Sequence, residues 1–298
     1  MGYRLLAWCA WPLFLGAQIA VVVAVGYARP DALARATGLT TVAVMMLLIG
    51  LEQVLPYRLD WSIRGDRDVW RDLGHAVLYA GIGGLLAQTI FVAGATSALA
   101  GLGVPHGFAV WPASATTAVQ VSLVIVLGDL LEYGFHRLAH AVPWLWSLHS
   151  IHHTPGRLST VKGPRHHYLY YLGRGLFVWL PLVTIGVPPG LIVWQFVAVV
   201  VAGVLAHANI AFRIPAVANR LIVTPAFHRL HHSMDGREGN SNFATVLPLW
   251  DVLFGTHADP LRAAPVATGI EGDPVPRAFV GELLWPVTEV RRRWRRAS

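Results

Sequence analysis

The sequence has little charge and almost no cysteine. Only 13% of its 298 residues are charged, against about 25% in an average soluble domain, and the mean hydropathy is +0.52. We therefore do not expect an ordinary water-soluble enzyme. Cys9 is the only cysteine, which excludes an intrachain disulfide, cysteine-based zinc knuckles and iron–sulfur clusters. Any metal site must be built from histidine and carboxylate side chains.

Lysine is also nearly absent, so arginine supplies the positive charge. The net charge is +7, and Lys162 is the only lysine. This preference is typical of GC-rich coding and favours a bacterial source. Five arginines fall in the last eight residues, namely Arg291, Arg292, Arg293, Arg295 and Arg296. Next to a membrane, such a cluster is expected to contact anionic lipid headgroups. Because no nucleic-acid-binding motif accompanies it, we expect no nucleic-acid partner.

Two long uncharged runs near the N-terminus predict membrane-spanning helices. The first lies between Arg4 and Arg29, and the second covers about residues 36–55. Each provides the roughly 20 residues needed to cross a bilayer core of about 30 Å. We interpret the first run as an anchor, because it is longer than the roughly 7–15 apolar residues of a cleaved signal peptide.

Two further uncharged stretches follow. Residues 73–128 are interrupted near the middle by Gly101–Gly107, which predicts two more spans joined by a short loop. Residues 175–212 contain Pro188 and Pro189 and are too short for two full crossings. They predict a short helical hairpin that enters and leaves the membrane from one side.

The distribution of arginine predicts the orientation. Four arginines lie between the second and third spans, and the loop after the third span has none. Cytoplasmic loops carry the excess of positive charge, so the former segment is expected on the cytoplasmic side. The prediction is an all-α, multi-pass integral membrane protein of a bacterial inner membrane. It has about four transmembrane helices, a short helical hairpin and a cytoplasmic helical cap.

Histidines are concentrated in one part of the chain. Eleven of the 14 fall between residues 136 and 232, and the motif His-x-x-His-His occurs at both 149–153 and 228–232. Histidines at positions i, i+3 and i+4 share one helical face, as do His136 and His140. About eight imidazoles are expected to converge, and burying them without a metal would be costly. This number exceeds the four ligands of a structural zinc ion and predicts two metal ions. A site of nitrogen ligands suits iron, copper or zinc.

Two carboxylates precede the first of these histidines on the same helical face. Asp129 and Glu132 lie seven and four residues before His136. Either carboxylate is suited to accept the free ring N–H of a ligating histidine, which fixes its orientation, or to bind metal directly. By contrast, we interpret the isolated residues His75, His106 and His257 as ordinary polar side chains.

Together these motifs resemble the fatty acid hydroxylase/sterol desaturase superfamily of integral-membrane di-iron enzymes. The resemblance covers about residues 68–272 and is carried by His136-Arg-Leu-Ala-His140, His149-Ser-Ile-His-His153, His207-Ala-Asn209, Val223-Thr-Pro225 before His228-Arg-Leu-His-His232, and Trp250-Asp-Val-Leu-Phe-Gly-Thr256. It implies nine metal ligands: His136, His140, His149, His152, His153, His207, His228, His231 and His232. It also suggests pocket or ligand-supporting roles for His167, Asn209 and Asn242.

The resemblance further implies a reaction. Two iron ions would use O2 and electrons from an external reductase to hydroxylate or desaturate a lipid, with hydroxylation favoured. The lipid could be a sterol, hopanoid, fatty acyl chain, ether lipid or carotenoid. The chain divides accordingly into a two-span segment (1–72), a catalytic domain (73–272) and a basic tail (273–298), with the metal site on the cytoplasmic side.

Two alternatives remain open. The separate family of acyl-lipid desaturases has similar histidine motifs, but Trp250-Asp-Val-Leu-Phe-Gly-Thr256 and Val223-Thr-Pro225 argue against it. A membrane metal transporter or metal-binding protein would place ligands along a pathway within the spans. The predicted histidines instead gather beyond the ends of the spans.

Overall fold

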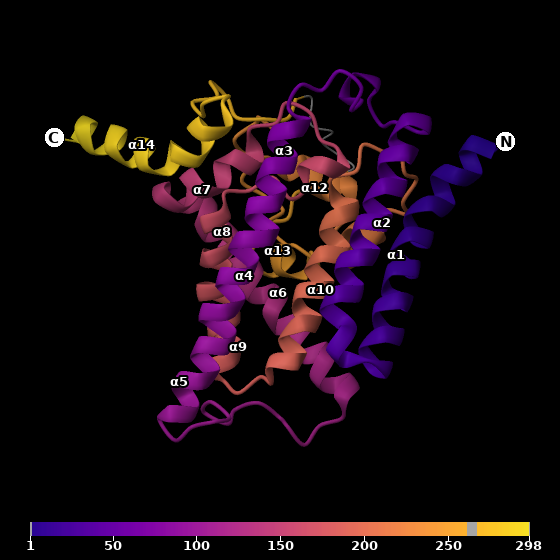
Figure 1. Cartoon of the computed structure of the whole chain (residues 1–298). Helices are drawn as coiled ribbons and strands as arrows, with labels where there is room; N and C mark the ends of the chain where they lie inside the picture. Colours follow the sequence, from indigo (N-terminus) through magenta and orange to yellow (C-terminus); the bar gives the residue numbers. More distant parts are fainter. Residues whose placement is uncertain (1, 261–266, 298) are drawn as a thin grey trace.

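The computed structural model describes residues 2–260 and 267–297, and these residues are helical with connecting loops (Figure 1). Within these ranges the extended backbone pairs only as isolated bridges, Pro56 with Ile210 and Ser233 with Thr268. The predicted all-α fold is therefore confirmed.

Five helices are long and apolar enough to cross a membrane. They are α1 (Gly2–Ala28), α2 (Leu33–Val54), a continuous helix from Val69 to Gly101, α6 (Thr117–Ala141) and α10 (Pro189–Ala206). The continuous helix consists of α3 (Val69–Ala76), η3 (Val77–Gly83), α4 (Gly84–Ala87), η4 (Gln88–Gly94) and α5 (Ala95–Gly101). Large apolar side chains face outward on these helices, such as Leu13 and Met46, which are 66% and 65% exposed. Surfaces of this kind are stable in lipid, and the chain is a multi-pass membrane protein.

Both arms of the predicted hairpin are longer than expected. Its first arm is α8 (Tyr168–Arg174), η6 (Gly175–Trp179) and α9 (Leu180–Thr184). This arm begins seven residues before the uncharged stretch, because the charge of Arg174 is paired inside the protein with Glu132. Proline then starts α10, whose 18 residues are enough for a fifth span. Figure 1 shows that α9 and α10 meet at the end of the molecule opposite both termini.

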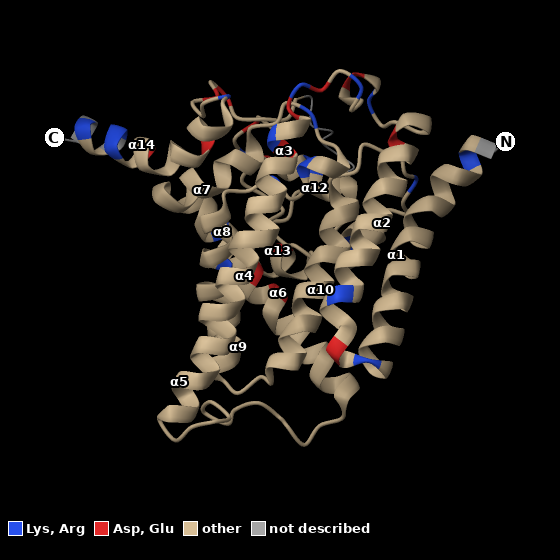
Figure 2. Cartoon of the chain, viewed as in Figure 1, with Lys and Arg blue, Asp and Glu red and all other residues tan. Residues whose placement is uncertain are grey.

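Short helices form a cap at the end of the spans where both termini lie (Figure 1). They are η2 (Leu59–Trp61), α7 (Pro143–His153), η5 (Thr160–Lys162), α11 (Ala218–Leu221), α12 (Pro225–His231) and α14 (Phe279–Ala297). Another short helix, α13 (Leu249–Leu253), lies deeper, between the spans (Figure 1). Most charged residues gather at this end, whereas the spans carry few (Figure 2). A short 3₁₀ turn, η1 (Pro30–Ala32), joins α1 to α2. The molecule thus has an apolar body and one polar end.

A network of buried charges ties the cap to the spans. Lys162 Nζ lies 2.8 Å from Asp66 and 2.6 Å from Asp72. Arg165 Nη1 pairs with the other oxygen of Asp72 at 2.5 Å, and its Nη2 donates to Glu282 of α14. All five side chains are at most 5% exposed. Charges this deep are stable only when they are paired.

Glu282 is the point at which α14 joins this network. Its carboxylate also accepts from His75 Nε2 at 2.8 Å and from Arg71 Nη1 at 3.1 Å. One turn later, Trp285 Nε1 donates to Ser150 of α7 at 3.1 Å. The first turns of the predicted basic tail are therefore part of the folded cap. The predicted boundary between residues 72 and 73 falls inside α3, and the division into three segments stays a prediction.

Replacing Glu282 with alanine should destabilise the cap, because it removes one partner from buried Arg165 and His75 and from partly exposed Arg71. Breaking a buried ion pair from one side costs about 3–5 kcal/mol. We expect a loss of this size in the free energy of unfolding, measured in mild detergent. The matched control is Glu271→Ala, an exposed site where a change within about 0.5 kcal/mol is expected. Equal stability of the two variants would show that the network does not hold α14.

Candidate metal centre

Nine histidines form two adjacent clusters in the described part of the chain. Within each cluster, one ring nitrogen from every histidine lies within 4.8 Å of the others. The first contains His136, His140, His149, His153 and His231, and the second contains His152, His207, His228 and His232. His140 is partly exposed, and the other eight are at most 8% exposed. The rings of His153 and His232 stack with centroids 4.4 Å apart, so the two clusters are in contact.

The two His-x-x-His-His motifs contribute to both clusters. In α7, His149 and His153 turn to the first cluster, and His152 between them turns to the second. The motif at α12 does the reverse: its outer histidines join the second cluster, and His231 joins the first. In each motif, the middle histidine therefore lies in the cluster that the other motif mainly forms. α6 adds His136 and His140 to one cluster, and the C-terminal end of α10 adds His207 to the other.

The spacing between the ring nitrogens matches that of ligands around one metal ion. In the first cluster, His149 Nε2 lies 2.9 Å from His136 Nε2 and 3.1 Å from His153 Nε2. In the second, successive Nε2 atoms are 3.2, 2.9 and 3.1 Å apart along the series His152, His207, His228 and His232. Metal–nitrogen bonds of about 2.1 Å at right angles place two ligand atoms about 3.0 Å apart. Both clusters therefore have the size of a coordination sphere.

Hydrogen bonds at Nδ1 fix the tautomer of four cluster histidines, so that the nitrogen facing the cluster carries a lone pair. His136 Nδ1 donates to the Phe243 carbonyl at 2.7 Å, and His231 Nδ1 donates to the Ser241 carbonyl at 2.8 Å. In the second cluster, His152 and His207 donate from Nδ1 to the carbonyls of Arg165 and Gly203, both at 3.2 Å. A carbonyl oxygen only accepts, so Nδ1 carries the proton. In the neutral ring Nε2 then has a lone pair and is free to bind a metal.

These rings are neutral near pH 7. Burial lowers the pKa of His149, His152, His153 and their counterparts in α12 well below the ordinary value, and that of His207 to about 4. His152 and His207 therefore direct two lone pairs at each other across 3.2 Å with no proton between them. In the first cluster, the Nε2 atoms of His140 and His231 are buried and have no hydrogen-bond partner among the described residues. The unprotonated Nε2 atoms that converge in each cluster are the donors that a metal ion requires, so one metal ion fits each cluster.

One loop orients three histidines of the first cluster. Residues 240–244 present the Asn240 side chain to His140 Nδ1 at 3.4 Å, in addition to the carbonyls of Ser241 and Phe243. Asn242 holds this loop in a left-handed turn, with φ of 56°, and its amide bonds to the backbone of Phe227 and Ala258. Asp251 accepts the N–H groups of Phe243 and Ala244, both at 2.8 Å. Asn242 thus shapes the loop that contacts the first cluster, and its predicted role in supporting metal ligands stays a prediction.

The two predicted carboxylates form other contacts. Asp129 accepts the N–H groups of Val246 and Leu247 and the indole N–H of Trp250, at 2.8–3.1 Å. Glu132 forms a buried ion pair with Arg174, whose Nε lies 2.9 Å from one carboxylate oxygen. Neither carboxylate bonds to a cluster histidine among the described residues. They anchor loops and helices around the site.

His167 and Asn209 also lie outside the clusters. His167 caps α8, accepting the Leu169 N–H at Nδ1 and donating from Nε2 to the Leu283 carbonyl of α14 at 3.1 Å. The Asn209 side chain pairs with the backbone N–H and carbonyl of Arg58, both at 3.0 Å. This contact fixes the loop that follows His207.

Three ring-bearing residues that the sequence analysis did not single out lie against the clusters. His166 stacks on His152 with ring centroids 3.9 Å apart. Tyr170 stacks on His149 at 4.8 Å, and Trp146 lies 4.9 Å from His140. No motif quoted from the sequence marks these three residues, although His166 directly precedes His167.

The arginines of α14 lie at the outer edge of the cap, and only part of this group is described. Arg291, Arg292 and Arg295 are exposed, and Arg292 pairs with Glu289 at 2.6 Å. The side chains of Arg293 and Arg296 lie outside the described residues. The same helix exposes the apolar residues Val280, Leu284, Val287, Val290 and Trp294. An apolar face with arginines beside it is typical of a helix at a membrane surface.

Comparisons with known proteins agree with this arrangement. The fatty acid hydroxylase family matches residues 121–256, which carry all nine cluster histidines. The ornithine lipid hydroxylase OlsE of Rhizobium tropici is 32% identical over 258 residues, which are 86% of this chain and 76% of that protein. The fatty acid hydroxylase vlmA of a Lecanicillium species is 29% identical over 50% of this chain and 44% of its own length. Human alkylglycerol monooxygenase is 27% identical over 43% of this chain and 28% of its own length. No solved structure matches the chain.

The predicted resemblance is thereby confirmed. The alignment with the relative from Rhizobium tropici covers 86% of this chain, and the family match contains both His-x-x-His-His motifs. With its membrane helices and its two histidine clusters, the chain belongs to the fatty acid hydroxylase/sterol desaturase superfamily.

Proposed function

We propose that this protein is a membrane-bound di-iron enzyme that hydroxylates a lipid with O2 and electrons from an external reductase. The observation that carries the proposal is the pair of adjacent histidine clusters, each with ring nitrogens spaced as metal ligands. Nitrogen ligands without thiolates suit iron, and the named relatives are lipid hydroxylases and monooxygenases. We propose all nine histidines as the ligands.

In the proposed mechanism the iron ions, when bound, supply the activation of dioxygen that makes an unreactive C–H bond accessible. The chain supplies the surroundings. Backbone carbonyls fix the tautomers of His136, His152, His207 and His231, so that Nε2 stays available for binding. Nearly complete burial of the clusters keeps bulk water away from the reacting carbon. The helices place the site at one end of the membrane-spanning segments, where a lipid substrate can reach it from the bilayer.

The electrons are proposed to come from a separate protein. The single cysteine excludes an iron–sulfur cluster within this sequence, and no flavin- or haem-binding motif accompanies it. The polar cap next to the clusters is the side from which a water-soluble reductase would approach (Figure 2).

The cap is proposed to face the cytoplasm of a bacterial cell, with the spans in the inner membrane. The segment between α2 and α3 carries Arg58, Arg64 and Arg67, and Arg71 lies in the first turn of α3. Figure 2 shows that this segment lies at the cap end. At the opposite end, the loop between α5 and α6 has no arginine or lysine, and the turn between α1 and α2 has Arg29, which pairs with Asp31. The excess of positive charge therefore supports a cytoplasmic cap.

The first substrate to test is ornithine lipid. The relative named for this activity aligns with 86% of the chain, whereas the other two named above align with half or less. The protein would be produced in a bacterium that makes ornithine lipid but does not hydroxylate it, and the extracted lipids would be compared by mass spectrometry. We expect a new lipid with one additional oxygen atom.

The control is the same strain producing His149→Ala, which removes one proposed ligand of the first cluster. No new lipid should form in this strain. A lipid that lacks two hydrogens instead would identify a desaturase. An unchanged lipid profile in both strains, with iron present in the purified protein, would contradict ornithine lipid as the substrate.

A metal transporter is the alternative from another class. Transport requires weak ligands spread along a path through the spans. The nine histidines instead form two compact clusters at one end of them. This placement favours an enzyme.

A further inference from the structure

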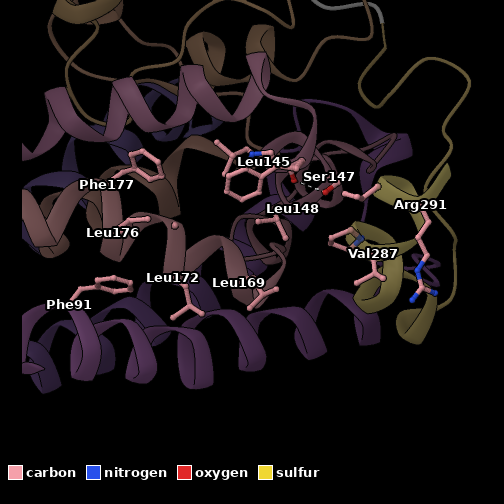
Figure 3. Close-up of a pocket in the computed structure, with 14 residues that line it drawn as sticks. Phe91, Leu145, Ser147, Leu148, Leu169, Leu172, Leu176, Phe177, Val287 and Arg291 are labelled. Atoms are coloured by element: carbon pink, nitrogen blue, oxygen red, sulfur yellow. Dashed lines mark hydrogen bonds between the residues drawn. The ribbon is translucent and has the colours of Figure 1, made fainter. Parts of the chain in front are cut away.

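We propose that an apolar groove between α7, α8, η4 and α14 binds one lipid molecule, with its acyl chain along the groove and a carboxylate or phosphate of its headgroup at Arg291. We call this the acyl groove. Phe91, Leu148, Leu172, Phe177, Val287 and Arg291 are among its lining residues (Figure 3). The inference rests on the proposed function in one respect, because the bound lipid is taken to be the substrate.

The acyl groove has the size and chemistry of a lipid site. Its volume is about 560 Å³, within the range of roughly 300–1,000 Å³ that is usual for small-molecule sites. Apart from Ser147 and Arg291, the side chains that line it are apolar. Ser147 turns its hydroxyl to the Trp144 carbonyl at 2.6 Å, which leaves the guanidinium of Arg291 as the charged group. An apolar cleft with one cation suits an amphiphile with one anionic group.

Two glycines allow the walls of the groove to form. A Cβ atom on Gly173 would lie 2.6 Å from Phe135 Cζ, and one on Gly175 would lie 2.3 Å from Phe91 Cδ2. Both distances are too short for any other residue without movement of the ring. The two glycines allow Phe135 and Phe91 to pack directly against the backbone of α8 and η6. This close packing shapes the wall of the acyl groove.

Aromatic side chains in mutual contact lie between the groove and the metal centre. Phe177 in the groove stacks on Phe135 with ring centroids 5.3 Å apart, and Phe135 directly precedes His136. Phe135 also lies 4.9 Å from Tyr170, which stacks on His149. On the α7 side, the lining residue Leu148 directly precedes His149. A chain in the groove would thus lie close to the first cluster, unlike lipids that coat the outer faces of α1 and α2.

The charge of the groove lies at the end that reaches the membrane surface. Figure 3 shows Phe91 and Phe177 at one end of the row of lining residues and Arg291 at the other. Phe91 belongs to the helix Val69–Gly101 that spans the membrane, whereas Arg291 belongs to α14 in the cap. The groove is therefore apolar at the end inside the membrane and charged at the end near the membrane surface, like a lipid in a bilayer. Arg291 has no ion-pair partner within the described residues, so its charge is available to a headgroup anion.

The test is photocrosslinking with the purified full-length chain in maltoside micelles. Two probes carry the same diazirine-labelled acyl chain, one on phosphatidylglycerol and one on a trimethylammonium lipid that has no anionic group. We expect the phosphatidylglycerol probe to label α7 and α8 about fivefold more than the cationic probe, since one arginine near a membrane contributes about 1 kcal/mol. Labelled residues are located by mass spectrometry of peptides.

Two variants and one control sharpen the result. Arg291→Gln should reduce labelling by phosphatidylglycerol about fivefold. Arg295→Gln removes the same charge one helical turn beyond the groove and should change labelling less than twofold. Leu172→Trp adds bulk inside the groove and should reduce labelling by either probe about tenfold. Equal labelling by the two probes, equal effects of the two arginine variants, or labels spread over the outward faces of α1 and α2 would each overturn the inference.

The measurement does not depend on catalysis. Selective labelling of the groove in a protein that hydroxylates no lipid would uphold the lipid site and refute the proposed function. Hydroxylation by a protein whose groove is not labelled would refute the lipid site alone.

Discussion

Replacing His231 with alanine is expected to remove one of two bound iron ions and to lower hydroxylase activity at least about a hundredfold. Loss of a residue that merely supports a metal ligand already costs about 10–100-fold, and we propose His231 as a ligand of the five-histidine cluster. His152→Ala should have the same effect through the four-histidine cluster. In both variants the iron content should fall from two per chain towards one, and activity should be lost with it.

The control for these variants is His106→Ala. His106 is exposed in the loop between α5 and α6, at the end of the molecule opposite the clusters. Iron content and activity should both stay normal. If His231→Ala or His152→Ala kept two irons and full activity, the residue would not be a ligand.

Removing Glu132 is expected to destabilise the packing of the membrane-spanning helices. Its carboxylate accepts from Arg174 and from Gln195 Nε2 at 3.2 Å, and Arg174 in turn donates to Tyr79 at 3.2 Å. These contacts join α6, α8, α10 and η3 in the apolar interior. Glu132→Ala leaves Arg174, which is 5% exposed, as a buried charge without its carboxylate partner. A loss of about 3–5 kcal/mol is expected in the free energy of unfolding, measured in mild detergent.

A double variant separates this structural role from metal binding. Glu132→Gln combined with Arg174→Met removes both charges, and it should recover most of the lost stability. Its iron content should stay at two per chain. If Glu132→Ala were as stable as the unchanged protein but lost iron, Glu132 would be a ligand and its pairing with Arg174 secondary.

The sequence predicted the helical membrane fold and the convergence of the histidines because both depend on spacing along the chain. Uncharged runs of sufficient length predict spans, and the i, i+3, i+4 pattern places three imidazoles on one face of α7. The pattern could not show that His152 turns to a different cluster from His149 and His153, since that depends on how α7 and α12 face each other. His207 was recognised only through its family motif, because an isolated histidine in an apolar helix carries no pattern.

The supports of the histidines were predicted less well, for a physical reason. Asp129 and Glu132 were expected to contact the ligands because they share a helical face with His136. In the structure, these carboxylates satisfy backbone N–H groups and a buried guanidinium, and carbonyl oxygens take the supporting role. Every residue carries a carbonyl, so sequence cannot distinguish those of Ser241 and Phe243 from others. Similarly, the charge of Arg174 ended the uncharged stretch, although the hairpin continues past it. Its neutralising partner Glu132 lies 42 positions earlier, so the sequence pattern could not show the pairing.

The central claim is that the two histidine clusters hold two iron ions per chain. The most direct test is elemental analysis of the protein purified from iron-supplied cells, combined with Mössbauer spectroscopy of the ⁵⁷Fe-labelled sample. We expect two irons per chain in nitrogen-rich sites whose spins are coupled, as adjacent clusters require. A single metal ion per chain, or zinc in both clusters together with zinc transport into vesicles, would contradict this account.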